Sequence, residues 1–215
     1  MAARLRVLLG DDHRMFSEAL AHLLESQFEV VGIIDNGREL IAAAEKLRPD
    51  VILVDISMPG LNGLEAARRI QKMSHAPKTV FLTMHEDATY ATAAFQAGAS
   101  GYVLKRSTPA EIITAVREAM LGRRYVSPLI DPDLLNRLQK KNDHPEKLKT
   151  ELTTRQREIL QLLAEGKSPK EIGAVLNISS RTAEFHKYRI MVATGAKTIA
   201  ELTRYAIAHG IVQAS

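Results

Sequence analysis

The feature that most constrains the fold is a regular alternation in the first half of the chain. Short runs of β-branched and aliphatic residues alternate with segments whose apolar residues recur at helical spacing. Continuous apolar strands are typical of a sheet covered on both faces, and strand–helix alternation implies right-handed crossovers and a parallel sheet. The pattern predicts a five-stranded, doubly wound α/β domain. Its predicted strands are residues 4–9, 29–34, 51–54, 79–82 and 101–104.

A change of pattern marks the end of this first domain. Residues 123–149 contain three prolines and a polar run, with one short amphipathic stretch around Leu134 and Leu138. Such a composition between two periodic segments is typical of a connecting loop. We therefore predict a first domain at residues 1–122 and an interdomain linker at residues 123–149.

From residue 150 to residue 215 every apolar run has helical period. Capping-box patterns at Thr153 and Ser168 mark the starts of two helices, and two more helices follow. The second and third helices are separated by a tight turn at Asn177. A helix pair that presents its second helix outward is the geometry that reads a DNA groove. The sequence predicts a small all-α domain with a helix-turn-helix at residues 150–215.

Composition excludes several classes of function. The 215 residues include no cysteine, so a disulfide framework, a thiolate metal site and thiol catalysis are excluded. The first apolar run is far shorter than the about 20 residues of a membrane span, and we expect a cytoplasmic protein with no membrane partner. Residues 1–124 hold 15 basic and 15 acidic residues, whereas residues 125–215 hold 14 and 10. This small positive excess suits a polyanionic partner but also fits a solvated surface.

Polar side chains follow four of the five predicted strands. Asp11 and Asp12 follow the first strand, and Asp55 follows the third. Thr83 ends the fourth strand and Lys105 follows the fifth. Because ligands of doubly wound sheets bind outside the carboxyl ends of the strands, we expect these side chains to share one crevice.

Three carboxylates in one crevice need a cation. Two of them 4 Å apart near a surface repel each other by roughly 4 kcal/mol. Mg²⁺ fits, because it takes oxygen ligands from one or two carboxylates together with water and phosphate. With Mg²⁺ and Lys105 neutralising charge, Asp55 can act as a nucleophile and form an aspartyl phosphate. In the alternative interpretation these residues are helix caps and turn residues without a ligand.

At this point the residues resemble a known family. Asp11-Asp12, Asp55 with Met58-Pro59-Gly60 after it, Thr83 and the run from Tyr102 to Lys105 resemble the receiver domains of two-component response regulators, over about residues 4–122. The resemblance implies a flavodoxin-like fold and a cognate sensor histidine kinase as partner. It implies Asp55 as phosphoacceptor, Asp11, Asp12, Asp55 and the backbone carbonyl of Ser57 as Mg²⁺ ligands, Thr83 and Lys105 as contacts of the phosphoryl group, and Tyr102 as a switch residue that follows Thr83.

The sequence departs from that family after the site lysine. Arg106 stands where many receivers have proline. Ser57 and His85 lie near the path of an attacking water, at positions where receivers vary. We interpret His13 and His85 as solvent-exposed neighbours rather than metal ligands.

The C-terminal domain resembles a second family. Residues 152–160, 166–172 and 176–182 look like the LuxR-type helix-turn-helix, over about residues 150–212. Together the two resemblances indicate the NarL/FixJ-like response regulators. The basic residues of the third helix, about 180–193, would contact phosphates, whereas its acidic and aromatic residues would meet base edges. The predicted contacts of double-stranded DNA are Lys170, Ser180, Arg181, Thr182, Glu184, Phe185, Lys187, Tyr188 and Arg189.

The last predicted helix, about residues 198–209, carries an apolar stripe. In relatives this helix pairs two output domains on DNA, although packing in the domain's own core gives a similar stripe. We predict a homodimer in the phosphorylated or DNA-bound state, with half-sites roughly 34–36 Å apart. The residues of this predicted dimer interface are Ile199, Leu202, Tyr205 and Ala206.

The combined prediction is a phosphorylation-dependent transcription regulator without enzyme activity beyond self-dephosphorylation. Two alternatives from other classes remain. In one, the receiver controls a protein–protein contact and the helices bind no specific DNA sequence. In the other, the protein is a phosphotransferase or a magnesium-dependent hydrolase, with the C-terminal helices as a lid.

Overall fold

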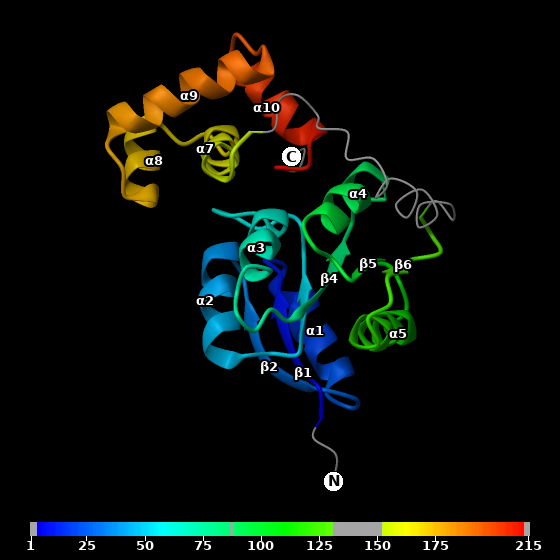
Figure 1. Cartoon of the computed structure of the whole chain (residues 1–215). Helices are drawn as coiled ribbons and strands as arrows, with labels where there is room; N and C mark the ends of the chain where they lie inside the picture. The colour runs from blue at the N-terminus through cyan, green and yellow to red at the C-terminus, as the bar shows by residue number, and fades with distance from the viewer. Residues whose placement is uncertain (1–3, 87, 131–151, 213–215) are drawn as a thin grey trace. The chain divides into compact units, whose positions relative to one another are not determined.

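The structure, a computed structural model, describes residues 4–86, 88–130 and 152–212. The chain divides into two compact units, Met1–Pro145 and Glu146–Ser215. Figure 1 shows a sheet with flanking helices in the first unit and helices in the second. Within the described residues, no helix has the length and apolar character needed to cross a membrane.

A parallel sheet with strand order β2-β1-β3-β4-β5-β6 forms the centre of the first unit. Every neighbouring pair of strands is parallel. Because β2 lies outside β1, the strand order reverses between β1 and β3, and a crevice at the carboxyl ends is expected there. The predicted doubly wound α/β fold is confirmed. The strands are β1 (Arg6–Gly10), β2 (Glu29–Ile34), β3 (Val51–Val54), β4 (Lys78–Thr83), β5 (Gly101–Leu104) and β6 (Tyr125–Val126).

The sixth strand, β6, was not predicted. Two residues are too few to show a period, and they lie in the segment that the sequence assigned to the linker. β6 pairs with β5, and Ile130 is only 3% exposed in the core of this unit. The described part of the predicted linker, residues 123–130, therefore packs on the first domain. Residues 131–149, including the amphipathic stretch around Leu134 and Leu138, lie outside the described residues.

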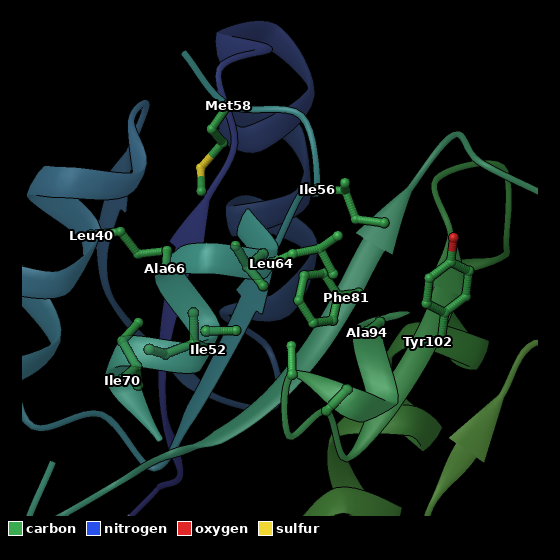
Figure 2. Close-up of a cluster of buried hydrophobic side chains, with 14 of the residues drawn as sticks. Leu40, Ile52, Ile56, Met58, Leu64, Ala66, Ile70, Phe81, Ala94 and Tyr102 are labelled. Carbon is green, nitrogen blue, oxygen red and sulfur yellow. The ribbon is translucent and has the colours of Figure 1, made fainter. Parts of the chain in front are cut away.

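Helices cover both faces of the sheet. Residues of α1 (Arg14–Leu24) and α5 (Pro109–Met120) form one buried core with one set of strand side chains. Residues of α2 (Gly37–Leu47), α3 (Gly63–Ile70) and α4 (Ala88–Gln96) form a second core with the alternate set. Figure 2 shows this second core, in which side chains from β3, α3 and β4 lie against one another. These strands are buried on both faces, which explains their unbroken apolar runs.

The described part of the second unit, residues 152–212, forms four helices around a core of its own. The two predicted capping boxes are present: the side chains of Thr153 and Ser168 each accept the amide of the third helical residue, and their own amides donate to the side chain of that residue. Asn177 ends the second helix with a φ of 53°, a left-handed conformation that asparagine tolerates. The helices are α7 (Thr154–Ala164), α8 (Pro169–Leu176), α9 (Ser180–Thr194) and α10 (Ile199–Ala208).

Candidate functional site

The structure brings the predicted polar residues together at the carboxyl end of the sheet. Asp11 follows β1, Asp55 follows β3, and Lys105 follows β5. The Lys105 ammonium lies 2.8 Å from Oδ2 of Asp11 and 2.7 Å from Oδ2 of Asp55. Thr83, at the end of β4, is fully buried, and its backbone carbonyl accepts a hydrogen bond from the Lys105 amide at 2.8 Å. One ammonium thus bridges two carboxylates in a buried crevice.

Asp55 has the most perturbed environment in this crevice. It is 1% exposed, and both side-chain oxygens are buried. Burial raises the pKa of the Asp55 carboxyl, whereas the Lys105 ammonium lowers this pKa and the nearby Asp11 raises it. A carboxylate held in this way is typical of a functional site, because burying charge costs folding free energy.

The donor set fits a divalent cation. Ligand atoms of Asp11, Asp12, His13 and Asp55 all lie within 4.8 Å of one another. Besides the Lys105 ammonium, the backbone of Ser57 hydrogen-bonds the Asp55 carboxylate and lowers its pKa. A buried carboxylate that faces two further carboxylates matches the preference of Mg²⁺ for oxygen ligands. Ser57 lies two residues after Asp55 in the same loop.

The loop between β3 and α3 is held tightly against Asp55. The side chain of Asn62 caps α3 by accepting the Glu65 amide at 2.9 Å. The Gly63 amide donates to the Ile56 carbonyl at 2.8 Å. A Cβ atom at Gly63 would lie 2.0 Å from the backbone oxygen of Asp55, so only glycine fits there. The backbone of Asp55 is therefore held on one side by the close approach of Gly63 to its carbonyl and on the other by its own amide, which donates to the Gly10 carbonyl at 2.8 Å.

A second group of contacts connects Thr83 with Tyr102. The Tyr102 hydroxyl donates to the His85 carbonyl at 2.9 Å, and the His85 amide donates to the Thr83 hydroxyl at 3.3 Å. The Tyr102 ring is fully buried, so it is not a surface aromatic. Figure 2 shows it at the edge of the core, with its hydroxyl at the outer end.

The interpretation of His85 as a solvent-exposed neighbour is wrong. The residue is half-buried, its ring stacks on Tyr90 with centroids 3.9 Å apart, and its Nε2 lies 3.3 Å from the Ser57 hydroxyl. Sequence analysis missed these contacts because they depend on the conformations of two loops. The available signal was the position of His85, two residues after Thr83.

In the second unit, α9 presents a polar and aromatic face. Phe185 is 57% exposed and Tyr188 is 66% exposed, which is high for aromatic side chains. The Arg189 guanidinium lies 5.8 Å from the Phe185 ring centroid. This face is the one expected to contact DNA. Of the other predicted contacts, Lys170, Ser180, Arg181 and Glu184 are exposed, and Thr182 and Lys187 are partly buried.

The four residues of the predicted dimer interface on α10 differ in how deeply they are buried. Leu202 and Ala206 are fully buried in the core of this unit, so their side chains are not available to a second copy. Ile199 is 42% exposed and Tyr205 is partly buried. The assignment of Leu202 and Ala206 to an interface is thus corrected, because core packing produces the same spacing.

Comparisons with known families match both units. Residues 7–117 match the family described as "Response regulator receiver domain", and residues 150–206 match "Bacterial regulatory proteins, luxR family". The response regulator UvrY of Escherichia coli K12 is 32% identical over 215 residues, covering 98% of this chain and 97% of the relative. The transcriptional regulatory protein MctR of Rhizobium johnstonii is 34% identical over 211 residues, covering 97% and 96%.

Solved structures of response regulators are similar to most or nearly all of this chain. RcsB of Salmonella enterica serovar Typhimurium, bound to promoter P1flhDC in the presence of the phosphomimetic BeF3⁻, is 25% identical with a TM-score of 0.63 and covers 95% of this chain and 99% of that one. A two-component response regulator of the LuxR family from Aurantimonas sp. SI85-9A1 is 32% identical with a TM-score of 0.57, covering 66% and 100%. The similarity therefore extends across the receiver-like unit and the helical unit.

Proposed function

We propose how this chain works from the premise that it belongs to the response regulators that join a receiver domain to a LuxR-type DNA-binding domain. As a member of this family it is a two-component response regulator that acts in transcription regulation, and it is not a classical enzyme. We propose that a cognate sensor histidine kinase phosphorylates Asp55. This modification shifts the protein toward a dimer that binds DNA.

In the proposed transfer, the residues of the crevice supply the nucleophile and the positive charge beside it. An oxygen of Asp55 attacks the phosphorus of a phosphohistidine. The P–N bond breaks, a P–O bond forms, and the imidazole leaves with its electron pair and takes up a proton. The Lys105 ammonium, 2.7 Å from the attacking carboxylate, remains beside the new phosphoryl oxygens. Mg²⁺, when bound by Asp11, Asp12, Asp55 and the carbonyl of Ser57, supplies further positive charge to those oxygens.

The contacts of Thr83 support a switch. A phosphoryl group adds about −1.5 to −2 charge and strong acceptor oxygens, to which the Thr83 hydroxyl donates. In the present structure the Thr83 hydroxyl accepts a hydrogen bond from the His85 amide, and the His85 carbonyl accepts one from the Tyr102 hydroxyl. Movement of Thr83 toward the phosphoryl group therefore disturbs both ends of His85 and the position of Tyr102. Hydrolysis of the acyl phosphate by water, near Ser57 and His85, resets the switch.

The output domain would contact DNA through α9. Its exposed basic side chains, together with Lys170 at the start of α8, meet phosphates and orient the domain. Glu184, Phe185 and Tyr188 face the base edges, where a carboxylate accepts from cytosine and aromatic edges meet the thymine methyl group. The exposure of this face and the promoter-bound structure of the relative RcsB support this assignment.

A dimer would supply part of the free energy of the switch. Changing a two-state population from 1:99 to 99:1 requires a difference of about 5.5 kcal/mol. Pairing of two output domains contributes to this by mass action and addresses two half-sites on DNA. We propose Ile199 and the exposed part of Tyr205 as the contacts of α10 in this dimer.

The observation that carries the proposal is the buried Asp55 carboxylate bridged to Asp11 by Lys105 in a chain that also carries a LuxR-type domain. The test is selection and sequencing of bound genomic fragments with wild type and Asp55→Asn, each with Mg²⁺ and a small-molecule phosphodonor. We expect wild type alone to enrich a shared sequence. Enrichment by both proteins would remove phosphorylation as a requirement, and enrichment by neither would favour the protein–protein interaction module.

A further inference from the structure

The chain that leads from the receiver toward the second domain is first held at the edge of the receiver sheet. The Ser127 amide donates to the Tyr102 carbonyl at 2.9 Å, and the Ile130 amide donates to the Ser127 carbonyl at 3.0 Å. The Ile130 side chain is buried in the core of the receiver. The main chain thus holds residues 125–130, which we call the exit segment, on the receiver.

The side chain of Ser127 holds the exit segment as well. Its hydroxyl donates to a carboxylate oxygen of Glu111 at 2.6 Å and lies 3.3 Å from the Ser107 hydroxyl. A hydroxyl–carboxylate bond of this length is charge-assisted and roughly twice as strong as a neutral one. Because Ser127 is 1% exposed, water has little access to these contacts, and breaking them leaves a buried polar group without a partner. The exit segment is therefore joined to α5 by a strong, shielded hydrogen bond.

The Glu111 carboxylate is directed at the exit segment rather than at its own helix. Glu111 is the third residue of α5, a position from which glutamate can complete a capping box. At Thr153 and Ser168 the third helical residue returns its side chain to the amide of the cap residue, whereas Glu111 accepts the Ser127 hydroxyl. Burial raises the pKa of the Tyr125 phenol, and Glu111 raises this pKa further by its charge and by accepting a hydrogen bond. Two residues of the exit segment thus share one carboxylate.

Ser107 connects these contacts with the phosphoryl crevice. It lies two residues after Lys105, in the loop between β5 and α5. The Lys105 ammonium bridges the carboxylates of Asp11 and Asp55. A phosphoryl group on Asp55 offers this ammonium new oxygens, and any movement of Lys105 moves the loop that carries the Ser107 hydroxyl. The exit segment therefore contacts the same loop that carries the lysine of the crevice.

We propose that Glu111 couples the two domains: its carboxylate, together with the hydroxyls of Ser107 and Ser127, holds the exit segment to the loop between β5 and α5, so that the segment follows the state of Asp55. The inference rests on the proposed function, because a switch at Asp55 is what the exit segment transmits. Glu111 is a positioning residue, since it acts through Ser127 and not on the phosphoryl group. Without its carboxylate, the receiver and the output domain should respond more independently of each other.

The first test is hydrogen exchange of the full chain, measured by nuclear magnetic resonance at the amides of Ser127 and Ile130. Glu111→Ala removes the carboxylate, and Ser127→Ala removes the hydroxyl. Glu118→Ala is the matched control, because Glu118 lies on the same helix, carries the same charge and pairs with Arg123 at 3.4 Å. We expect both amides to exchange about tenfold faster in Glu111→Ala and Ser127→Ala, the factor that corresponds to a lost charge-assisted hydrogen bond, and as in wild type in Glu118→Ala. Unchanged exchange in Glu111→Ala would overturn the proposal.

The second test asks whether this contact carries the signal. DNA affinity is measured by titration of a genomic fragment that wild type enriches, before and after treatment with Mg²⁺ and a small-molecule phosphodonor. We expect the ratio of the two affinities to fall by about fivefold or more in Glu111→Ala and Ser127→Ala and to stay at the wild-type value in Glu118→Ala. A contact with a structural role alone would change Tm and hydrogen exchange but not this ratio. Faster exchange with an unchanged ratio therefore also overturns the proposal.

Intact-mass analysis separates failure of this inference from failure of the proposed function. All four proteins should gain one phosphoryl group after treatment with Mg²⁺ and the phosphodonor, because the substitutions leave the residues of the crevice in place. If wild type gains none, or if its DNA affinity does not depend on the phosphoryl group, the proposed function is overturned. If wild type and Glu111→Ala switch equally, only the coupling role of Glu111 is overturned.

Discussion

Replacement of Gly63 by alanine should damage the loop between β3 and α3 more than the same replacement at Gly60, the other glycine of this region. The added Cβ would lie 2.0 Å from the backbone oxygen of Asp55, and ordinary van der Waals contact begins at 3.4 Å. Asp55 or the start of α3 must therefore move by more than 1 Å. The same movement stretches the hydrogen bond from the Gly63 amide to the Ile56 carbonyl, now 2.8 Å long.

The magnitude follows from these two losses. Overpacking costs about 1–3 kcal/mol, and a weakened backbone hydrogen bond adds about 0.5–1.5 kcal/mol. Together they lower the free energy of unfolding by about 2–4 kcal/mol, which corresponds to a decrease in Tm of roughly 10 °C for a domain of this size. Because a misplacement of about 1 Å can cost 10²-fold in rate, phosphorylation of Asp55 should slow by about that factor.

The assay compares Gly63→Ala with Gly60→Ala. Gly60 has a φ of 72°, but a Cβ added there would meet no atom within 4 Å, so its substitution adds only backbone strain of about 1–2 kcal/mol. Calorimetric unfolding gives Tm, and quenched phosphodonor reactions analysed by intact mass give the rate. The reasoning fails if Gly63→Ala unfolds and is phosphorylated like Gly60→Ala.

Three further predictions concern charge. Asp55→Asn should stabilise the receiver by about 0.5–2 kcal/mol at pH 7 in chemical denaturation, because it removes a buried carboxylate. Burial raises the folded-state pKa of Asp55, so the wild type is destabilised as the pH rises from the unfolded pKa of about 3.9 through the folded pKa and Asp55 loses its proton. The advantage of Asp55→Asn over the wild type should therefore shrink as the pH is lowered from 7 toward 4. Arg155→Met should destabilise the output domain by about 3 kcal/mol in thermal unfolding, because the guanidinium lies 2.9 Å from the buried Glu158 carboxylate. A double variant that also carries Glu158→Met should recover most of this loss. Arg181→Gln should weaken binding to all DNA sequences alike and reduce the slope of log binding constant against log salt concentration by about 0.9. Tyr188→Ala should instead change the sequence preference. Equal salt slopes for wild type and Arg181→Gln would contradict the phosphate contact.

The parts of the fold that could be predicted are those set by local chemistry and by topology. Strands buried on both faces have to be apolar throughout, so β3 and β5 have their predicted bounds. The capping boxes at Thr153 and Ser168 form between residues three positions apart, so they can be recognised from the sequence alone. The crevice follows because parallel strands bring their carboxyl ends to one edge, which places Asp55 beside Lys105.

The parts that could not be predicted depend on distant contacts. β6 is a two-residue strand that exists only through its pairing with β5. Leu202 and Ile199 share the helical spacing of one apolar stripe, yet Leu202 is fully buried in the core and Ile199 is 42% exposed. The ring of His85 is positioned by loops whose conformation no periodicity encodes. Spacing along a helix indicates an apolar face but not what covers it.

Tyr102 joins the phosphoryl crevice to the last strand of the receiver through both its side chain and its main chain. The hydroxyl holds the His85 carbonyl at 2.9 Å, and the Tyr102 carbonyl accepts the Ser127 amide at 2.9 Å at the end of β6. The Ser127 hydroxyl in turn donates to Glu111 of α5 at 2.6 Å. Because the ring is fully buried, its rotation leaves a large space in a close-packed core, and the surrounding residues have to rearrange. The segment that follows β6 is therefore held by the main chain of the residue whose hydroxyl contacts the His85 carbonyl, and in the proposed switch a change at Asp55 would reach this segment through Thr83, His85 and Tyr102.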